Sequence, residues 1–160
     1  MPPASNAISE LLLLLDEAFQ RRAWHGTNLL GSIRGIDPEP AARRPGLGRH
    51  NIWELIIHTA YWKYAVTRRL TGAARGTFPY KGSNWFVRDG GPSDDLKRDV
   101  SLLKQCHREL LEAVRKVKPA ELGTRSPGSK HPRGFMIRGI AAHDLYHAGQ
   151  VQLIKRLMTP

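Results

Sequence analysis

The sequence predicts an all-α fold, a four-helix bundle formed by residues 1–160 as a single domain. Four long segments repeat apolar residues at intervals of three and four, which is the period of an amphipathic helix. No segment alternates apolar and polar residues as a half-buried strand does. A chain of this length can bury one sizeable core but hardly two. The expected helices span residues 5–22, 51–70, 93–117 and 135–158, with a long loop between the second and the third.

The first expected helix carries five consecutive leucines at residues 11–15, so it is apolar on every side there. One side would face the core of the bundle, and the other needs a second buried surface. Another copy of the chain is the simplest partner for that surface, so we expect a homodimer. The run is far shorter than the ~20 residues of a membrane span. Because Glu10 and Asp16 also flank it, we expect neither a membrane anchor nor a secretory signal.

The second expected helix begins after Asn51, whose side-chain oxygen suits the N-cap position. Leu55, His58, Trp62 and Ala65 follow at spacings of three and four, so they share one face. His58 therefore lies on a face that the bundle would bury. Taken alone, it is more simply explained as a core histidine that hydrogen-bonds to its surroundings than as a site residue.

Glycines and prolines recur through residues 71–92, which predicts a long loop. Loops of this kind often act as functional lids. This one also carries four aromatic residues, Phe78, Tyr80, Trp85 and Phe86. We expect these rings to plug one end of the bundle rather than to bind a ligand.

The third expected helix, residues 93–117, has Ser93 or Asp94 as its expected N-cap. Its apolar stripe passes through Cys106 or His107. We take Cys106 as the stripe position, which leaves His107 one step off the stripe, on the flank. Cys106 is the only cysteine, so no internal disulfide can form, as is usual for proteins of a reducing compartment. We therefore expect a cytoplasmic protein.

The fourth expected helix, residues 135–158, carries His143 and His147 within a stripe of apolar residues. A separation of four places both on one face with β-carbons about 5–6 Å apart, so both rings can reach a single divalent ion. Buried imidazoles need polar partners, and a metal ion would supply one. Without a third ligand, core histidines bonded to carbonyls or water explain the pair more simply.

His58 is the candidate third ligand, because facing helices of a bundle can direct their side chains at one point. A site of three histidines leaves coordination positions for water or substrate, which is typical of a catalytic rather than a structural metal. Imidazole ligands suit zinc, nickel, iron and cobalt alike, so the ligand type does not select the metal.

The formal net charge of +11 raises the question of nucleic-acid binding. The lysines and arginines are spread along the whole chain, without a run of five or six and without a nucleic-acid-binding motif. We therefore expect a solvated basic surface rather than a nucleic-acid partner. The same charge would favour an anionic small-molecule substrate.

Three stretches of the chain resemble the DinB/YfiT-like family of metal-dependent helical proteins. They are residues 23–26 (Ala-Trp-His-Gly), residues 50–55 leading to His58, and residues 143–150. The resemblance implies an up-down-down-up four-helix bundle, often dimeric, with zinc or nickel as the most expected metal. It also implies a histidine triad at His58, His143 and His147. Some relatives are S-transferases that use low-molecular-weight thiols, and others resemble hydrolases or isomerases, so the family does not define the reaction.

Two acidic residues lie near the expected triad. Glu54 precedes His58 by one helical turn and is a candidate catalytic base, or a partner for the second ring nitrogen of a ligand histidine. A glutamate that stabilises the first turn of its helix is the simpler explanation. Asp144 is turned by about 100° from His143 around the helix, so we expect it to be a poor direct ligand.

Three further residues are candidates for the rim of the same pocket. His25 and His50 lie in breaks of the helical pattern before the second helix, and Tyr146 lies between the two histidines of the fourth. A loop histidine bonded to backbone, or a packed tyrosine, would explain each of them without a site.

The leading hypothesis is a divalent-metal-dependent enzyme of the S-transferase or hydrolase type. It would activate a water or a thiol at the three-histidine site and act on a small substrate that is anionic or thiol-activated. One alternative is a bundle that binds metal without catalysis. The other is a basic protein associated with nucleic acid.

Overall fold

The computed structural model describes residues 4–158, with side chains from residue 7 onward, and it is all-helical in that range. Four helices are long: α1 (Ala4–Phe19), α4 (Ile52–Thr71), α5 (Ser93–Arg115) and α6 (Arg133–Met158). Three are short: α2 (Leu29–Ser32), α3 (Pro38–Ala42) and the 3₁₀-helix η1 (Pro119–Glu121). No strand occurs among these residues, and no helix of the described chain is long and apolar enough to cross a membrane.

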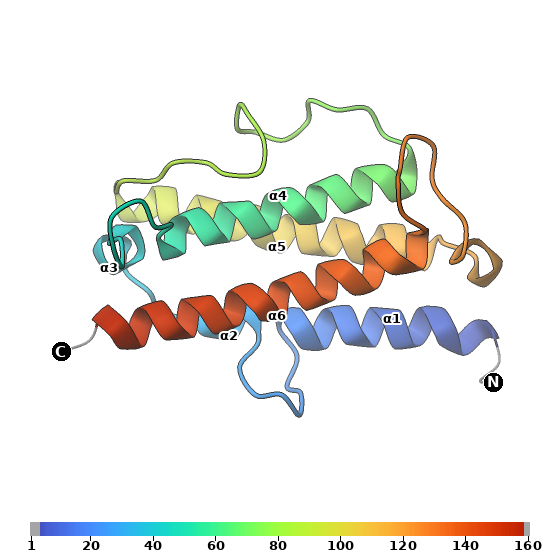
Figure 1. The fold of residues 1–160 in the computed structure, drawn as a ribbon, viewed down its shortest axis with the longest axis horizontal. Coiled ribbons are helices and arrows are strands. Elements are labelled where there is room, and N and C mark those ends of the chain that lie inside the picture. The colour runs from blue at the N-terminus through green and yellow to red at the C-terminus, as the bar shows by residue number, and fades with distance from the viewer. Residues whose placement is uncertain (1–3, 159–160) are drawn as a thin grey trace.

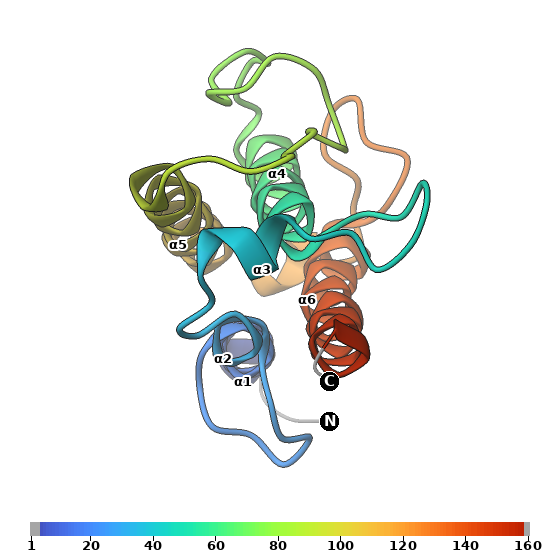
Figure 2. The same cartoon turned by 90° about the vertical axis from the view of Figure 1, so that its left-hand side faces the viewer.

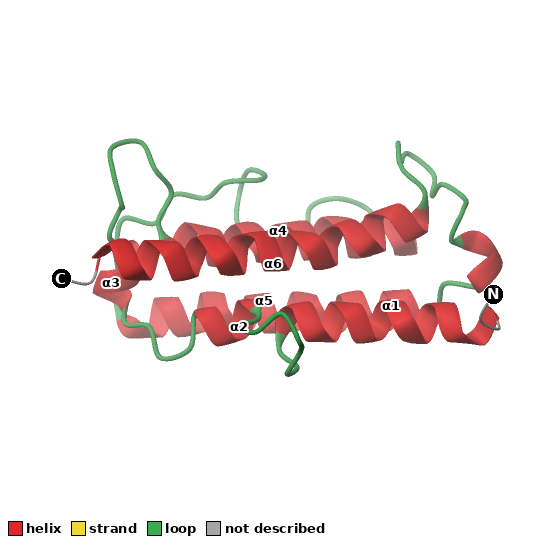
Figure 3. Ribbon diagram, turned by 60° about the horizontal axis from the view of Figure 1, so that its bottom comes forward, coloured by secondary structure: helices red, strands yellow, loops and turns green. Residues whose placement is uncertain are grey.

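The four long helices lie side by side along the long axis of the molecule (Figure 1). Seen from the end, they occupy the corners of a rough square, and α2 continues the corner that α1 begins (Figure 2). Figure 3 shows the same helices as two layers, with α4 and α6 in one and α1 and α5 in the other. The two helices that carry the predicted metal ligands, α4 and α6, are therefore direct neighbours.

Helix α4 is fixed at both ends by local features, of which the sequence predicts the first. The Asn51 side chain accepts a hydrogen bond from the Glu54 backbone N–H at 2.8 Å, which confirms Asn51 as the N-cap. Its amide nitrogen also donates to the backbone oxygens of Ala42 and Arg88, at 2.9 and 2.6 Å. At the other end Gly72 adopts φ 74°, a left-handed conformation that glycine reaches without steric cost.

The beginning of α5 differs from the prediction. The residue before the helix is Pro92, and no side-chain hydrogen bond caps it, so neither Ser93 nor Asp94 is the N-cap. Proline has no backbone N–H and a fixed φ, which suits a chain that enters a helix from an extended segment. Asp94 and Asp95 instead lie in the first turn, where the helix dipole favours negative charge.

His107 is another position where the structure corrects the sequence-based expectation. It is 1% exposed rather than at the flank, and its ring stacks on Phe19 of α1 with centroids 3.8 Å apart. Cys106 is buried as well. The contact face of α5 is therefore wider than a single stripe, as is usual for a helix that packs against two neighbours.

The leucines of α1 divide between the core and the surface. Leu11 and Leu15 are buried, whereas Leu14 is 37% exposed. Leu12 and Leu13 are half-buried. An outward apolar strip therefore remains on α1 beyond what the bundle covers, as the sequence predicts for this run.

The long loop between α4 and α5 runs back over the outer side of α4 (Figure 1). Its aromatic residues do not plug the end of the bundle. Phe78 lies 5.4 Å from the rings of both Tyr61 and Tyr64 of α4, and Phe86 is buried. The physical reason is that α4 offers its own aromatic side chains along that face, so the loop packs lengthwise on them.

The far end of this loop is anchored to the buried carboxylate of Asp99 on α5. That carboxylate accepts hydrogen bonds from Trp53 Nε1 at 2.7 Å, from Arg88 Nε at 3.1 Å and from the Tyr80 hydroxyl. Asp99 is 1% exposed, so these three donors offset the cost of its burial. Two loop residues are thereby held against the bundle on either side of Trp85.

Candidate metal centre

Three imidazoles meet between α4 and α6. The Nε2 atom of His143 lies 3.1 Å from Nε2 of His58 and 3.0 Å from Nε2 of His147. All three ligand atoms lie within 4.8 Å of one another. His58 and His147 are 5% and 4% exposed, and His143 is half-buried. The structure therefore brings together the three histidines that the spacing singled out.

The separations fit a shared ion. Nitrogen ligands about 2.0–2.1 Å from zinc in tetrahedral geometry lie about 3.3 Å from each other. The two short Nε2 separations are close to this value. The group can thus hold one divalent metal ion with small adjustments of the rings.

The protonation state of the rings also suits a metal. Burial lowers the pKa of His58 to about 4 and that of His143 to about 3, and it lowers the pKa of His147 as well. All three rings are therefore neutral at pH 7. A neutral imidazole has one nitrogen lone pair, which is the form that binds metal.

Hydrogen bonds at the outer nitrogens determine which lone pair is free. His58 Nδ1 donates to the backbone oxygen of Asn84 at 2.8 Å, and His147 Nδ1 donates to Gln150 Oε1 at 2.6 Å. Because both Nδ1 atoms carry the proton, both Nε2 atoms present lone pairs toward His143. A single proton on His143 Nε2 could satisfy at most one of these two lone pairs, whereas a cation would satisfy both.

Asn84 supports the site in a second way. It has φ 67°, and no other described residue except glycine has a positive φ. Its side-chain oxygen accepts a hydrogen bond from Trp62 Nε1 at 2.8 Å. One loop residue therefore connects His58 with a neighbouring side chain of α4, through its carbonyl oxygen and its amide respectively.

Trp85 lies between two histidines, one just before α4 and one within it. Its ring stacks on His50 with centroids 3.6 Å apart and on His58 with centroids 3.8 Å apart, at interplanar angles of 6° and 11°. The indole ring of Trp85 therefore separates His50 from His58 of the triad. The sequence indicates an aromatic loop but not this sandwich, because the partners lie on different segments.

Glu54 contacts His50 rather than a ligand histidine. Its carboxylate accepts a hydrogen bond from His50 Nδ1 at 2.7 Å, and Arg44 binds both carboxylate oxygens, at 2.5 and 3.1 Å. Burial opposes ionisation of Glu54, but the hydrogen bonds from Arg44 and His50 outweigh it, so its pKa is lowered. The expected contact between Glu54 and a ligand histidine is therefore absent among the described residues, and an ionised Glu54 orients His50 instead.

A cavity of about 670 Å³ opens beside the triad. His50, Trp85, Tyr146 and His147 line one part of it, and aliphatic side chains of α4 and α6 line another. His50 and Tyr146, two of the candidate rim residues, therefore line this cavity, and a role for them in binding stays a prediction.

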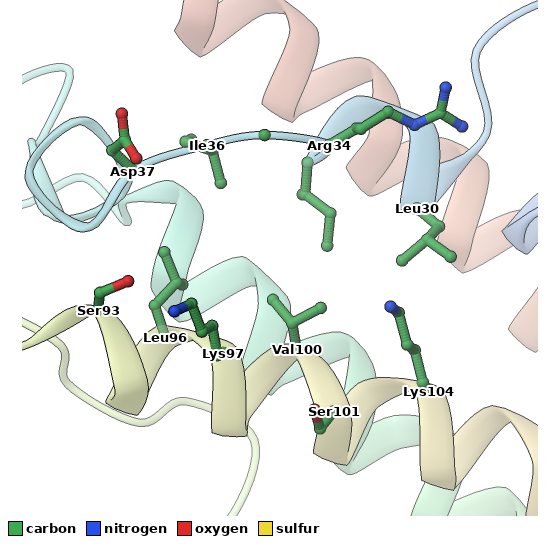
Figure 4. Close-up of a pocket in the computed structure, with 12 residues that line it drawn as sticks. Leu30, Arg34, Ile36, Asp37, Ser93, Leu96, Lys97, Val100, Ser101 and Lys104 are labelled. Carbon is green, nitrogen blue, oxygen red and sulfur yellow. The ribbon is translucent and has the colours of Figure 1, made fainter.

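His25 lies elsewhere. It lines a separate hollow of about 440 Å³ with Leu145 and Gly149, so the structure does not join it to the cavity beside the triad. A further hollow between the segment from α2 to α3 and α5 (Figure 4) contains none of the candidate site residues.

Asp144 is a structural neighbour of the triad with a role that the helical spacing alone does not indicate. Its carboxylate pairs with the Lys63 ammonium, and both side chains are fully buried. Burial raises the pKa of the Asp144 carboxyl, while the charge on Lys63 opposes that shift. The sequence does hold a signal for this pair, because Lys63 on α4 and Asp144 on α6 each occur in phase with apolar core positions of their helix.

The fold and the site define the chain as a helical-bundle protein whose three converging histidines could hold a metal ion. Residues 21–151 match the family model described as the DinB superfamily. The chain belongs to this family. Comparisons with curated proteins and with solved structures gave no match.

Proposed function

We propose that this protein is a divalent-metal-dependent enzyme that activates a water or a thiol for hydrolysis or S-transfer. The observation that carries the proposal is the convergence of three Nε2 atoms beside a cavity of about 670 Å³. Three protein ligands would leave coordination positions for water or substrate, and His147 joins the triad to the lining of the cavity. When bound, a divalent ion supplies Lewis-acid activation at neutral pH. Zinc and nickel are the leading candidates, and iron and cobalt fit the same ligands.

His50 is the residue we propose as proton acceptor. The bond to Glu54 keeps its proton on Nδ1, so Nε2 of the neutral ring carries the lone pair. The ring lines the cavity and is separated from His58 by the thickness of Trp85. Glu54 thus acts through His50, as a buried carboxylate that fixes the tautomer of a catalytic histidine.

The cavity favours a small substrate with an apolar part. Leu55, Leu153 and Leu157 are among its lining residues, and Arg49 supplies a positive charge. An apolar group would pack on the leucines while an anionic group meets Arg49. This agrees with an anionic or thiol-activated small substrate.

Metal content is the first test. Protein purified without an affinity tag should contain about one equivalent of zinc or nickel by mass spectrometry, and His58→Ala and His147→Ala should lose it. His131→Ala is the matched control, because His131 is an exposed loop histidine stacked on Phe135. Metal retained in both triad variants would contradict the proposal.

Proton transfer needs a separate test once a thiol or hydrolysis substrate has been found. His50→Gln should keep its metal but lower kcat by about 10²–10⁴-fold, the usual contribution of a general base. Glu54→Gln should alter the pH profile of kcat, because the tautomer of His50 is then no longer fixed by a carboxylate. Full activity in His50→Gln would exclude His50 as the proton acceptor, although the metal site could still stand.

The proposal includes the up-down-down-up connectivity and a homodimer. Figure 1 supports the connectivity, since α4 and α5 run in one direction and α1 and α6 in the other. The apolar strip around Leu14 on α1 supports the dimer. Sedimentation equilibrium should show a dimer that Leu14→Glu weakens. Leu47→Glu is the control, because Leu47 is fully exposed in a loop.

A further inference from the structure

A second cavity, of about 690 Å³, is lined by four cationic side chains and by no carboxylate. Arg68 and Arg69 come from the last turns of α4, and Arg75 and Lys81 come from the loop that runs over this helix. The cavity lies on the side of the loop where the aromatic cluster packs, and it shares no lining residue with the cavity beside the triad.

These four cations have no ion-pair partner among the residues that the structure describes. Other arginines of the chain do: Arg44 pairs with Glu54, and Arg88 pairs with Asp99. Arg69 makes only a cation–π contact, 5.9 Å from the centroid of Trp62. Cations near a helix C-terminus are stabilised by its dipole, but that accounts only for the two arginines of α4.

The rest of the lining is aromatic. Tyr61, Tyr64, Phe78 and Tyr80 contribute half-buried rings. The loop is held against them by a hydrogen bond from the Gly76 backbone N–H to the Tyr64 hydroxyl, at 3.2 Å. A planar ring can stack on such side chains, while clustered cations bind phosphate oxygens through charge-assisted hydrogen bonds.

We propose that this cavity binds a small phosphorylated molecule that carries a planar ring, of the nucleoside diphosphate class. Four positive charges would match the multiple negative charge of a diphosphate, and the tyrosines would hold the ring. A ligand with a single negative charge would leave most of the cations unneutralised.

The hollow of Figure 4 provides an internal comparison. It also has basic side chains at its edge, Arg34, Lys97 and Lys104, but Asp37 accompanies them and the floor is aliphatic. It therefore lacks both features that support the proposal: cations without a carboxylate, and aromatic walls.

The test is a calorimetric titration with ADP at about 0.15 M salt, where exposed charges more than about 8 Å apart are largely screened. The native chain should bind one equivalent, and Arg75→Ser/Lys81→Ser should weaken binding at least tenfold. Both residues are exposed in a loop, so the substitutions should not affect folding. The matched control, Arg34→Ser/Lys104→Ser, removes the same charge from the hollow of Figure 4 and should change affinity less than twofold.

Two further titrations are needed. One separates the contribution of the ligand's ring to the affinity from that of its phosphates, and the other tests whether the ligand binds at this cavity or at the triad. Inorganic pyrophosphate should bind at least tenfold more weakly than ADP, because it offers nothing to the tyrosines. ADP should bind His147→Ala as it binds the native chain, which shows that the phosphates do not coordinate a metal at the triad. Absence of saturable binding, or equal weakening in the two double variants, would overturn the proposal. Equal affinity for pyrophosphate and ADP would overturn the inference that the tyrosines bind the planar ring of the ligand.

Discussion

At the scale of single residues, Asn84 adopts a left-handed backbone conformation in which it contacts both His58 and Trp62. Its carbonyl oxygen orients His58, its amide holds Trp62, and its φ of 67° is unfavourable for most side chains. Asparagine tolerates this region better than other residues with a β-carbon, because its short polar side chain bonds locally. Sequence reasoning could not find Asn84, since nothing in a glycine-rich loop indicates which carbonyl will meet a histidine 26 residues earlier in the chain.

Substitutions at Asn84 should separate strain from hydrogen bonding. Asn84→Gly loses the bond to Trp62 but keeps an unstrained backbone, and we expect a loss of about 1 kcal/mol in the free energy of unfolding. Asn84→Ala loses the same bond and adds about 1–2 kcal/mol of left-handed strain. Urea denaturation would measure both. Equal stability of the two variants would mean that the backbone strain is relieved in another way.

His107 is a buried base with no hydrogen bond to either ring nitrogen among the described residues. The nearest charged oxygen, Asp16 Oδ1, lies 4.0 Å from its Nε2. Burial lowers the pKa of His107 well below its ordinary value, and the charge on Lys63 adds to the shift. As the pH falls, His107 in the unfolded chain therefore takes up a proton near pH 6.5, before the buried ring of the folded chain does. The folded state loses stability as the pH falls below that value.

Replacement of His107 by leucine should stabilise the protein. His107→Leu removes two unsatisfied buried nitrogens while retaining an apolar contact with Phe19, so we expect a gain of about 1–2 kcal/mol at pH 7. The gain should increase between pH 6.5 and pH 5, because the variant no longer has a proton to bind at this position. Urea denaturation at both pH values tests this, and a variant less stable than the native chain would show that the ring has a polar partner after all.

At the scale of elements, the pair Lys63–Asp144 fixes how α4 lies against α6. Both groups are fully buried, so a shift of one helix along the other would separate two charges in an apolar interior. Asp144 directly follows His143 and Lys63 is five residues after His58, so the ion pair and the triad are joined through the same two helices. The amphipathic period predicted both helices, but it could not predict a contact between residues 81 positions apart.

Single substitutions in this pair should cost more than the double substitution. Lys63→Met leaves a buried carboxylate without its cation, and we expect a loss of about 3–5 kcal/mol. Lys63→Met/Asp144→Leu removes both charges and should recover most of that loss. Chemical denaturation gives the three free energies. A double variant no more stable than Lys63→Met would indicate that packing, not the charge pair, holds the helices.

At the scale of the whole molecule, local spacing was enough to predict an all-helical protein and the pair His143 and His147. His58 is 85 residues from His143, so its place as third ligand came from the expected packing of facing helices and from the family resemblance. Four long helices follow from the period of their apolar residues, and His143 and His147 are related by one helical turn. The path of the loop over α4 depends on contacts between distant aromatic residues, so the expectation that it plugs the end of the bundle was wrong. His107 lies four residues after the buried Leu103 and three before the buried Leu110, so the helical period of α5 permits its burial. The contact that covers its ring comes from Phe19 of α1, which the sequence of α5 alone could not predict.

The net charge leads to a prediction about nucleic acid. The cations are dispersed, so any duplex binding should be non-specific, should weaken steeply between 50 and 200 mM salt, and should be unchanged in His58→Ala. Fluorescence anisotropy with labelled duplexes of two unrelated sequences would measure this. A sequence preference that survives at the higher salt would instead support the nucleic-acid alternative.

The placement of the triad on α4 and α6 affects when and how a metal could be acquired. His58 and His143 are 85 residues apart in the chain, so an ion held between them would act as a cross-link that closes a very long loop of the unfolded polymer. Helix α6 is synthesised after every other described element. During synthesis, His58 therefore emerges well before His143 and His147. The complete site exists only after α6 has docked. If the site holds a metal, loading would therefore be a late event that follows docking of α6.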